Sequence, residues 1–159
     1  FAVFCAHMGI AVFSIGAISD SFFSKEITLR SYPGQNISIG DNKIKFERSL
    51  QRIGPNFISQ TSKLILYDSN GKTKAILYPE KRIYPIEQQT TSEVAIHRQL
   101  DRDLYIVFGD GDKITGFTFR IYLKPFISMI WIGCILMALG GMFAIYPQIK
   151  KRIQNWAHN

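Results

Sequence analysis

The sequence predicts a membrane α-helical protein in which two spanning helices, part of a larger multi-span bundle, flank an inserted small antiparallel all-β domain. Three observations predict this. Residues 1–19 contain no Asp, Glu, Lys or Arg, residues 125–149 contain none, and the stretch between them alternates apolar with polar residues. A helix that crosses a bilayer needs about 20 mainly apolar residues. Both uncharged runs are therefore long enough to span a membrane.

The first apolar run, residues 1–19, is predicted to be a transmembrane helix that ends where Asp20 and Ser21 begin a polar segment. No basic segment precedes it and no small-residue cleavage site follows it, so a secretory signal peptide is a poor interpretation. We expect the helix to be truncated at its start and the chain to be the C-terminal piece of a larger membrane protein. Cys5 and Cys134 lie in the two apolar runs and form no Cys-x-x-Cys pair, which predicts small buried hydrophobes rather than a disulfide framework.

The middle segment, residues 20–124, is predicted to be the β domain. Pairs such as Ile44 and Phe46, separated by one polar residue, are typical of half-buried strands. Hairpins are expected around residues 68–71 and 109–113, since the Asn-Gly pair in the first tolerates the positive φ of a tight turn. The two aspartates of the second turn, Asp110 and Asp112, lack the rest of a calcium loop and indicate a solvated turn. A short helix is a further candidate around residues 92–100.

The second apolar run is predicted to be a transmembrane helix over residues 125–148, with Pro125 in its first turn. Trp131 and Tyr146 lie toward its two ends, as interfacial aromatics do. Gly140 and Ala144 are four residues apart, a spacing that lets another helix approach closely. We expect a packed helix of a multi-span bundle.

The net charge of +7 is unevenly distributed. All 12 acidic residues and all but three of the 19 basic residues lie between Asp20 and Lys124. The other three, in residues 150–152, directly follow the second apolar run and belong to a basic tail, residues 149–159. The positive-inside rule assigns this tail to the cytoplasm and, with two spans, residues 20–124 to the periplasmic side. A nucleic-acid-binding patch is the alternative for such a tail, and we expect no nucleic-acid partner.

His7 is the only side-chain titratable nitrogen in the first apolar run, and ionisable groups in such segments usually have a function. Four residues share its helix face at spacings of three, four and seven: Val3, Ile10, Ala11 and Ser14. The small ones among them leave room for a bulky flat ligand. At 1.5 Å per residue, His7 lies roughly 18 Å from the helix end near Ser19, at or beyond mid-membrane.

Three roles of His7 stay open from the residues alone. The imidazole could hydrogen-bond to a neighbouring helix, relay protons, or coordinate haem iron. A metal site built from several side chains is not expected, because no second His or carboxylate lies near His7 in the sequence. The acceptor that would orient its other ring nitrogen is expected outside this chain, because Ser14 is too far along the helix.

Ala6-His7-Met8-Gly9 opens an ordered series of short segments that runs along the whole chain. It continues with Gly54-Pro55-Asn56-Phe57, Tyr78-Pro79-Glu80-Lys81-Arg82 with Tyr84, Thr91-Ser92-Glu93-Val94-Ala95-Ile96, Asp103-Leu104-Tyr105, Arg120-Ile121-Tyr122-Leu123-Lys124-Pro125, Trp131-Ile132-Gly133 and Met137-Ala138-Leu139-Gly140-Gly141. Each segment alone is a weak signal. Their order and spacing resemble the cytochrome c maturation protein F family, the haem lyase subunit of System I cytochrome c biogenesis, over essentially all 159 residues.

The resemblance implies a multi-pass protein of the bacterial inner membrane, or of the mitochondrial inner membrane. Such proteins receive haem from a periplasmic haem chaperone and, with other System I haem lyase subunits, attach it to apocytochrome c. They also hold a separate haem b, reduced by quinol, between two transmembrane histidines. The resemblance implies that His7 is one of these axial ligands to the haem iron.

The resemblance assigns no catalytic residue to this chain, since the tryptophan-rich haem-handling segment of the family does not occur in it. His97 matches no family ligand and is expected to be a surface residue, and His158 a tail residue. The Pro79–Arg82 segment is either a docking surface or a charged strand end. The alternative function is a two-span membrane protein whose extracytoplasmic β domain is a cofactor-free assembly or sensing module.

Overall fold

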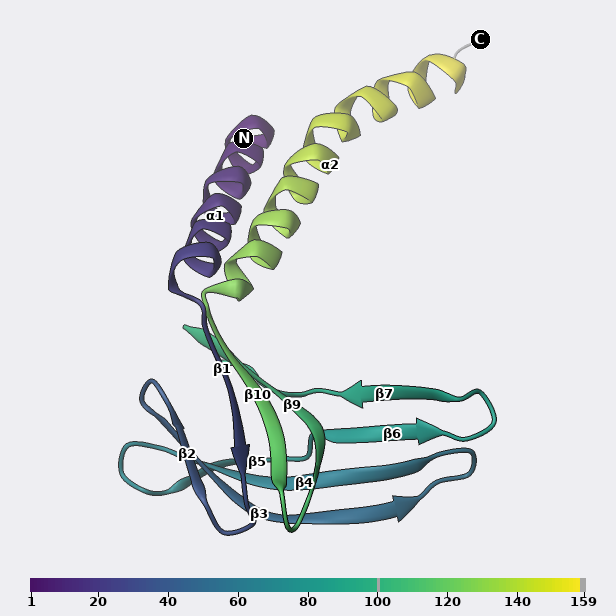
Figure 1. Cartoon of the computed structure of the whole chain (residues 1–159). Coiled ribbons are helices and arrows are strands. Elements are labelled where there is room, and N and C mark those ends of the chain that lie inside the picture. The colour runs from purple at the N-terminus through teal and green to yellow at the C-terminus, as the bar shows by residue number, and fades with distance from the viewer. Residues whose placement is uncertain (100, 158–159) are drawn as a thin grey trace. The chain divides into compact units, whose positions relative to one another are not determined.

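The computed structural model describes residues 1–99 and 101–157, which form two compact units, a helical pair and a β-sandwich (Figure 1). The helices are α1 (Ala2–Phe23) and α2 (Ile127–Ala157). The strands are β1 (Lys25–Ser31), β2 (Asn36–Ile39), β3 (Asn42–Ile53), β4 (Ile58–Tyr67), β5 (Thr73–Leu77), β6 (Glu80–Tyr84), β7 (Gln89–Glu93), β8 (Ala95–His97), β9 (Arg102–Asp112) and β10 (Gly116–Pro125). The prediction of two apolar helices around an antiparallel β domain is confirmed.

The β domain consists of two antiparallel sheets. One has four strands in the order β1-β10-β9-β8, and the other has the order β2-β3-β4-β6-β7 with β5 paired to β4 (Figure 1). The register of β1 on β10 places Ile27 opposite Ile121 and Leu29 opposite Phe119. Residues that face each other in this way point to the same side of a sheet, so alternate side chains of both strands enter the core.

The core of the sandwich comes from the inward-facing residues of both sheets. Phe46 of β3 packs edge-on against Phe117 and Phe119 of β10, with ring centroids 5.6 and 4.9 Å apart, and Phe108 of β9 lies against the same two rings. The remaining buried apolar residues are Ile37, Ile39, Ile44, Leu64, Leu66, Leu77, Leu104, Ile106, Ile121 and Leu123. The period-two pattern of the sequence therefore identifies the core face correctly.

Both predicted hairpins are present, but the second turns at residues 113–115 and not at 109–113, because residues 109–112 belong to β9. The candidate helix is wrong. Leu64 of β4 faces Leu77 of β5 across the Asp68–Gly71 turn, and β9 is the neighbour of β10. Residues 92–100 contain no helix where the structure describes them, since they hold the end of β7 and all of β8. Strand pairing prevails over helix propensity here, because Ala95 faces Ile106 of β9 and packs on the core.

The helical pair is held by glycines. Gly9 of α1 lies against Gly133 and Met137 of α2, and a Cβ atom at Gly9 would come within 2.8 Å of the Gly133 carbonyl oxygen. Gly16 meets Ile130 in the same way at the other end of the contact. The contact glycines of each helix are seven residues apart, two turns of a helix, which keeps them on one face.

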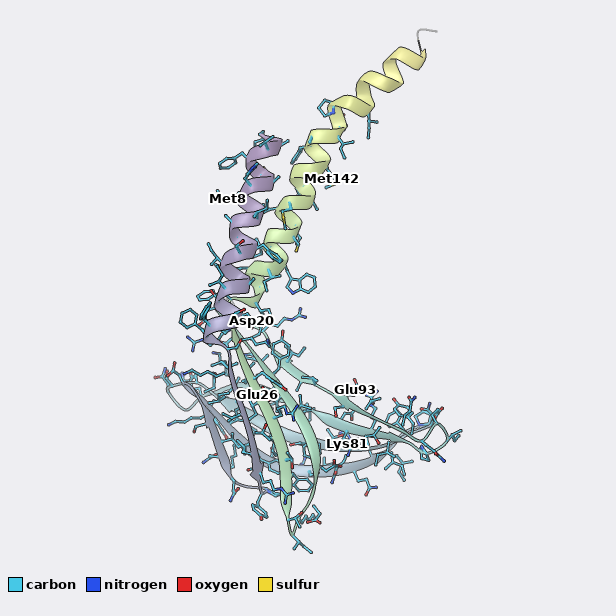
Figure 2. The ribbon with its side chains drawn as sticks, turned by 45° about the horizontal axis from the view of Figure 1, so that its top comes forward. Met8, Asp20, Glu26, Lys81, Glu93 and Met142 are labelled. Atoms are coloured by element: carbon cyan, nitrogen blue, oxygen red, sulfur yellow. The ribbon has the colours of Figure 1, made fainter. Side chains whose placement is uncertain are left out.

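Both helices are long and apolar enough to cross a membrane, by length and composition, over Ala2–Phe23 and Ile127–Pro147. Many of their large apolar side chains are exposed, and Trp131 is 70% exposed. Figure 2 shows Met8 of α1 and Met142 of α2 among these side chains. Pro125 ends β10, and α2 begins two residues later.

Candidate functional site

His7 lies on the second turn of α1, on an open face of the helical pair. Its Nδ1 is 2.8 Å from the backbone carbonyl oxygen of Val3, one turn earlier. A carbonyl oxygen can only accept a hydrogen bond, so Nδ1 carries the proton and donates it. In the neutral ring the proton on Nδ1 leaves the Nε2 lone pair available to a ligand.

The face that carries His7 is opposite the one that packs on α2. The α1 residues at the contact glycines are Ala2, Ala6, Gly9, Phe13 and Gly16. His7 is exposed and directly follows Ala6. One residue corresponds to a rotation of about 100° around the helix axis, so His7 lies about 100° from Ala6. The angle between His7 and the middle of the contact face is larger still, because Ala6 lies at the edge of that face. In the part of the chain that the structure describes, the imidazole is hydrogen-bonded to Val3 of its own helix and not to α2, so α2 is not the neighbouring helix that His7 would brace.

One ring nitrogen of His7 is engaged by the backbone of its own helix. Metal-bound histidines usually donate their second ring N–H to a carbonyl or carboxylate, which fixes the tautomer and the ring orientation. The Val3 carbonyl accepts a hydrogen bond from Nδ1, so the expectation that the acceptor for the other ring nitrogen lies outside this chain is wrong. The signal was available in the sequence, because a helical residue four positions earlier always presents its carbonyl on the same face.

The other histidine that the structure describes has different surroundings. His97 of β8 is half-buried, not a surface residue, and its Nε2 is buried with no hydrogen-bond partner in the described part of the chain. Burial, and secondly the ammonium group of Lys74, lower the pKa of the His97 imidazole, while Asp103 opposes the shift. The protonated form of His97 is therefore disfavoured. His158 lies outside the described residues.

Metal ligation by a cluster of side chains finds no support in the described residues, where no group of three or more His, Cys, Asp or Glu side chains could hold an ion. Asp112 instead organises its own turn, since one carboxylate oxygen accepts hydrogen bonds from Ile114 N and Thr115 N at 2.7 and 2.6 Å. These bonds lower the pKa of Asp112. The interpretation of this segment as a solvated turn fits that geometry. Cys5 and Cys134 are both free thiols.

Three of the segments that resemble the cytochrome c maturation protein F family meet on the six-stranded sheet. Arg82 lies 4.7 Å from the ring centroid of Phe57, donates from Nε to Glu80 at 2.5 Å and is 3.7 Å from Glu93 of the neighbouring strand. The hydrogen bond with Glu80 is the main cause that raises the pKa of Arg82. Glu80 also accepts a hydrogen bond from Thr61. These charges are paired within the domain, which favours a structural role over a docking surface.

Lys81 points to the other side of this sheet. It forms an ion pair with Asp110 of β9, and it faces Ser92 of β7 in the register, whereas Glu80 faces Glu93. The alternation divides the Pro79–Arg82 segment between the two faces of the sheet, so its charges do not form one patch.

Comparison with known proteins identifies the family. The model of the CcmF C-terminal beta-sandwich matches residues 22–125, well over half of the chain. The chain belongs to the CcmF family. Among curated relatives, the cytochrome c-type biogenesis protein NrfE of Haemophilus influenzae is 37% identical over 154 residues, covering 96% of this chain and 24% of the relative. The corresponding CcmF of Pseudomonas aeruginosa is 35% identical, covering 94% and 23%.

A solved structure has the same fold. The chain titled cytochrome c heme lyase CcmF superposes with a TM-score of 0.75 at 15% sequence identity, covering 92% of this chain and 24% of that one. The two apolar helices and the sandwich therefore recur together in a CcmF structure. The chain spans about a quarter of the length of the CcmF relatives that it matches.

Proposed function

We propose that this chain is the C-terminal part of a System I haem lyase that takes part in covalent attachment of haem to apocytochrome c. Membership of the CcmF family supports the class of function, since the relatives are named cytochrome c-type biogenesis proteins. The observation that carries the role of this chain is His7, an exposed residue of α1 whose Nδ1 donates a hydrogen bond to the Val3 carbonyl oxygen.

In this proposal His7 is an axial ligand to a haem b within the membrane. The residues present fit such a group: an imidazole whose Nδ1 is hydrogen-bonded to a backbone carbonyl oxygen, on an exposed apolar helix face where Ala11 adds little bulk. Haem, when bound, supplies an iron that accepts and passes on single electrons. The chain itself keeps a proton on Nδ1, which donates to the Val3 carbonyl oxygen, and would offer the Nε2 lone pair to the iron.

The two apolar helices support a membrane location, with α1 and α2 as spans in the bacterial inner membrane or the mitochondrial inner membrane. We propose that residues 1–19 and 125–148 cross the bilayer, that residues 20–124 form a periplasmic domain, and that residues 149–159 form a cytoplasmic tail. The basic residues 150–152 favour this orientation. The partners would be a periplasmic haem chaperone, other haem lyase subunits, apocytochrome c and quinol.

The test uses the intact protein that contains this chain, purified from membranes. It should show a b-type absorption spectrum that dithionite reduces, and His7→Ala should abolish the spectrum or weaken it at least about tenfold per protein. His97→Ala is the matched control and should leave it unchanged. In His7→Gly, added imidazole should restore the bands, because the free base can fill the vacated position. A full spectrum in His7→Ala would overturn the proposal and favour the cofactor-free assembly or sensing module.

A further inference from the structure

Gly140 of α2 lies against the turn of α1 that carries His7. A Cβ atom built on Gly140 would lie 2.7 Å from the backbone N of Ala6 and 3.0 Å from the carbonyl O of Ala2. Ala6 directly precedes His7, and Val3, which accepts the His7 hydrogen bond, directly follows Ala2. The backbone of one helix turn therefore touches Gly140 on one side and holds His7 on the other.

The atoms around Gly140 leave no room for a side chain. The atoms that a Cβ would meet belong to the α1 backbone, so rotating a side chain cannot relieve the contact. Interiors are close-packed and transmit such strain, so that α1 must shift or turn relative to α2. The adjacent Gly141 differs completely, since a Cβ there has nothing within 4 Å.

We propose that Gly140 is a positioning residue for His7. By letting α1 approach closely, Gly140 sets the position in which α1 presents the Nε2 lone pair of His7. The inference rests on the proposed function, in which Nε2 binds haem iron. Ligand groups must be held to within about 0.5 Å of their productive geometry. A displacement of α1 by a side chain at position 140 would move His7 relative to a haem that other parts of the protein also hold.

The experiment compares Gly140→Val with Gly141→Val in the intact, purified protein. The same side chain is added one residue apart on the same helix, so hydrophobicity and helix propensity are matched. Gly140→Val should lower bound haem b per protein by about tenfold, the range seen when a group that orients a metal ligand is lost. Gly141→Val should keep the wild-type haem content, spectrum and midpoint potential. Equal haem content and potential in the two variants would overturn the inference.

Two further variants guard against a general loss of packing. Gly140→Ala adds one methyl group, and should keep protein and haem while shifting the midpoint potential or the low-spin bands. An unchanged potential in Gly140→Ala would overturn the inference even where Gly140→Val fails to accumulate. Gly16→Val disturbs the same helix contact at Ile130, nine residues from His7. It should shift the spectrum less than Gly140→Val does; an equal shift would overturn the inference.

The two proposals fail separately. If His7→Ala keeps its haem, the proposed function is wrong whatever the Gly140 variants do. If His7→Ala loses its haem while Gly140→Val and Gly140→Ala match the wild type, only the positioning role is wrong.

Discussion

The sandwich and the helical pair use apolar side chains in opposite places. In the sandwich, Phe46, Phe108 and Phe119 are fully buried between the sheets. In the helical pair, glycines fill the contact while Trp131 is 70% and Ile135 60% exposed. Removal of apolar surface from water stabilises the first unit, whereas close backbone packing holds the second. The same apolar residue types therefore contribute differently to the stability of the two units.

The largest test of this contrast removes one apolar side chain from each unit. Phe119→Ala should destabilise the sandwich by about 3–5 kcal/mol, because it leaves a cavity beside the rings of Phe46 and Phe108. Ile135→Ala should change stability by less than about 1 kcal/mol, since its side chain has little packing to lose within the pair. Hydrogen exchange of the β9, β10 and α2 amides in the intact protein measures both. Similar losses of protection in the two variants would contradict the contrast.

A second test removes a polar contact of the kind that the sandwich needs at its turns. Asp68 accepts hydrogen bonds from Asn70 N and Lys72 N at 2.9 and 2.8 Å, which fixes the β4–β5 turn. Asp68→Ala should lower protection of the β4 and β5 amides by about 1 kcal/mol. Asp68→Asn retains an acceptor oxygen and serves as the control. The amides of α1 and α2 should keep their exchange rates in both variants.

A third test is the pH dependence of the sandwich at His97. The folded pKa of His97 is lowered, so the unfolded chain binds a proton more readily than the folded one. The resulting stability is present above the unfolded pKa of about 6.5 and declines as the pH falls through that value toward the folded pKa. Three charged or titratable groups bear on His97. Besides burial, Lys74 of β5 lowers its pKa, and Asp103 of β9 opposes that shift. Tyr105 of β9 acts indirectly, because its hydroxyl donates a hydrogen bond to Asp103.

Exchange of the β8 and β9 amides between pH 7.5 and 5.5 measures this loss. His97→Gln, which cannot titrate, should flatten the profile in that window, while Gly141→Val on α2 should retain it. A profile that is the same in wild type and His97→Gln would show that the stability change has another source.

The contrast also explains what the sequence could predict. Strand positions follow from period-two patterns because a sandwich has one inner face per strand, so residues such as Ile44 and Phe46 identify their own environment. His7 could be found because an ionisable residue stands out in an apolar run. The helix expected around residues 92–100 was wrong, because the pairing of β8 with β9 depends on tertiary contacts that helix propensity does not reflect.

The contact face of the helices was harder to predict because both are apolar all round. The sequence indicated Gly140 with Ala144, four residues apart, whereas the structure uses Gly140 with Gly133, seven apart. Gly9 and Gly16 have the same spacing in α1, so a comparison of the two runs with each other could have found the contact. The Val3 carbonyl was missed because side-chain reasoning alone overlooks backbone acceptors.

The smallest test concerns Phe126, where a non-glycine residue has a φ of +55° just before α2. Its amide donates to the Asp101 carbonyl and its carbonyl accepts from Met129 N, both at 2.9 Å, so the helical unit fixes this conformation from two sides. The left-handed conformation costs an L-residue about 1–2 kcal/mol. Glycine avoids that cost but loses about 0.5–1 kcal/mol in chain entropy on folding.

Phe126→Gly should therefore lie within about 1 kcal/mol of the wild type, with the relief of strain offsetting the entropy. Phe126→Val should be destabilising, because a β-branched residue tolerates positive φ worst. Exchange of the Met129 amide, which bonds to Phe126, reports both. Less protection in Phe126→Gly than in Phe126→Val would mean that the Phe126 ring, and not the backbone conformation, stabilises the start of α2. Such a result would mean that side-chain burial stabilises this turn, as it stabilises the sandwich. The two units would then differ less in what holds them together.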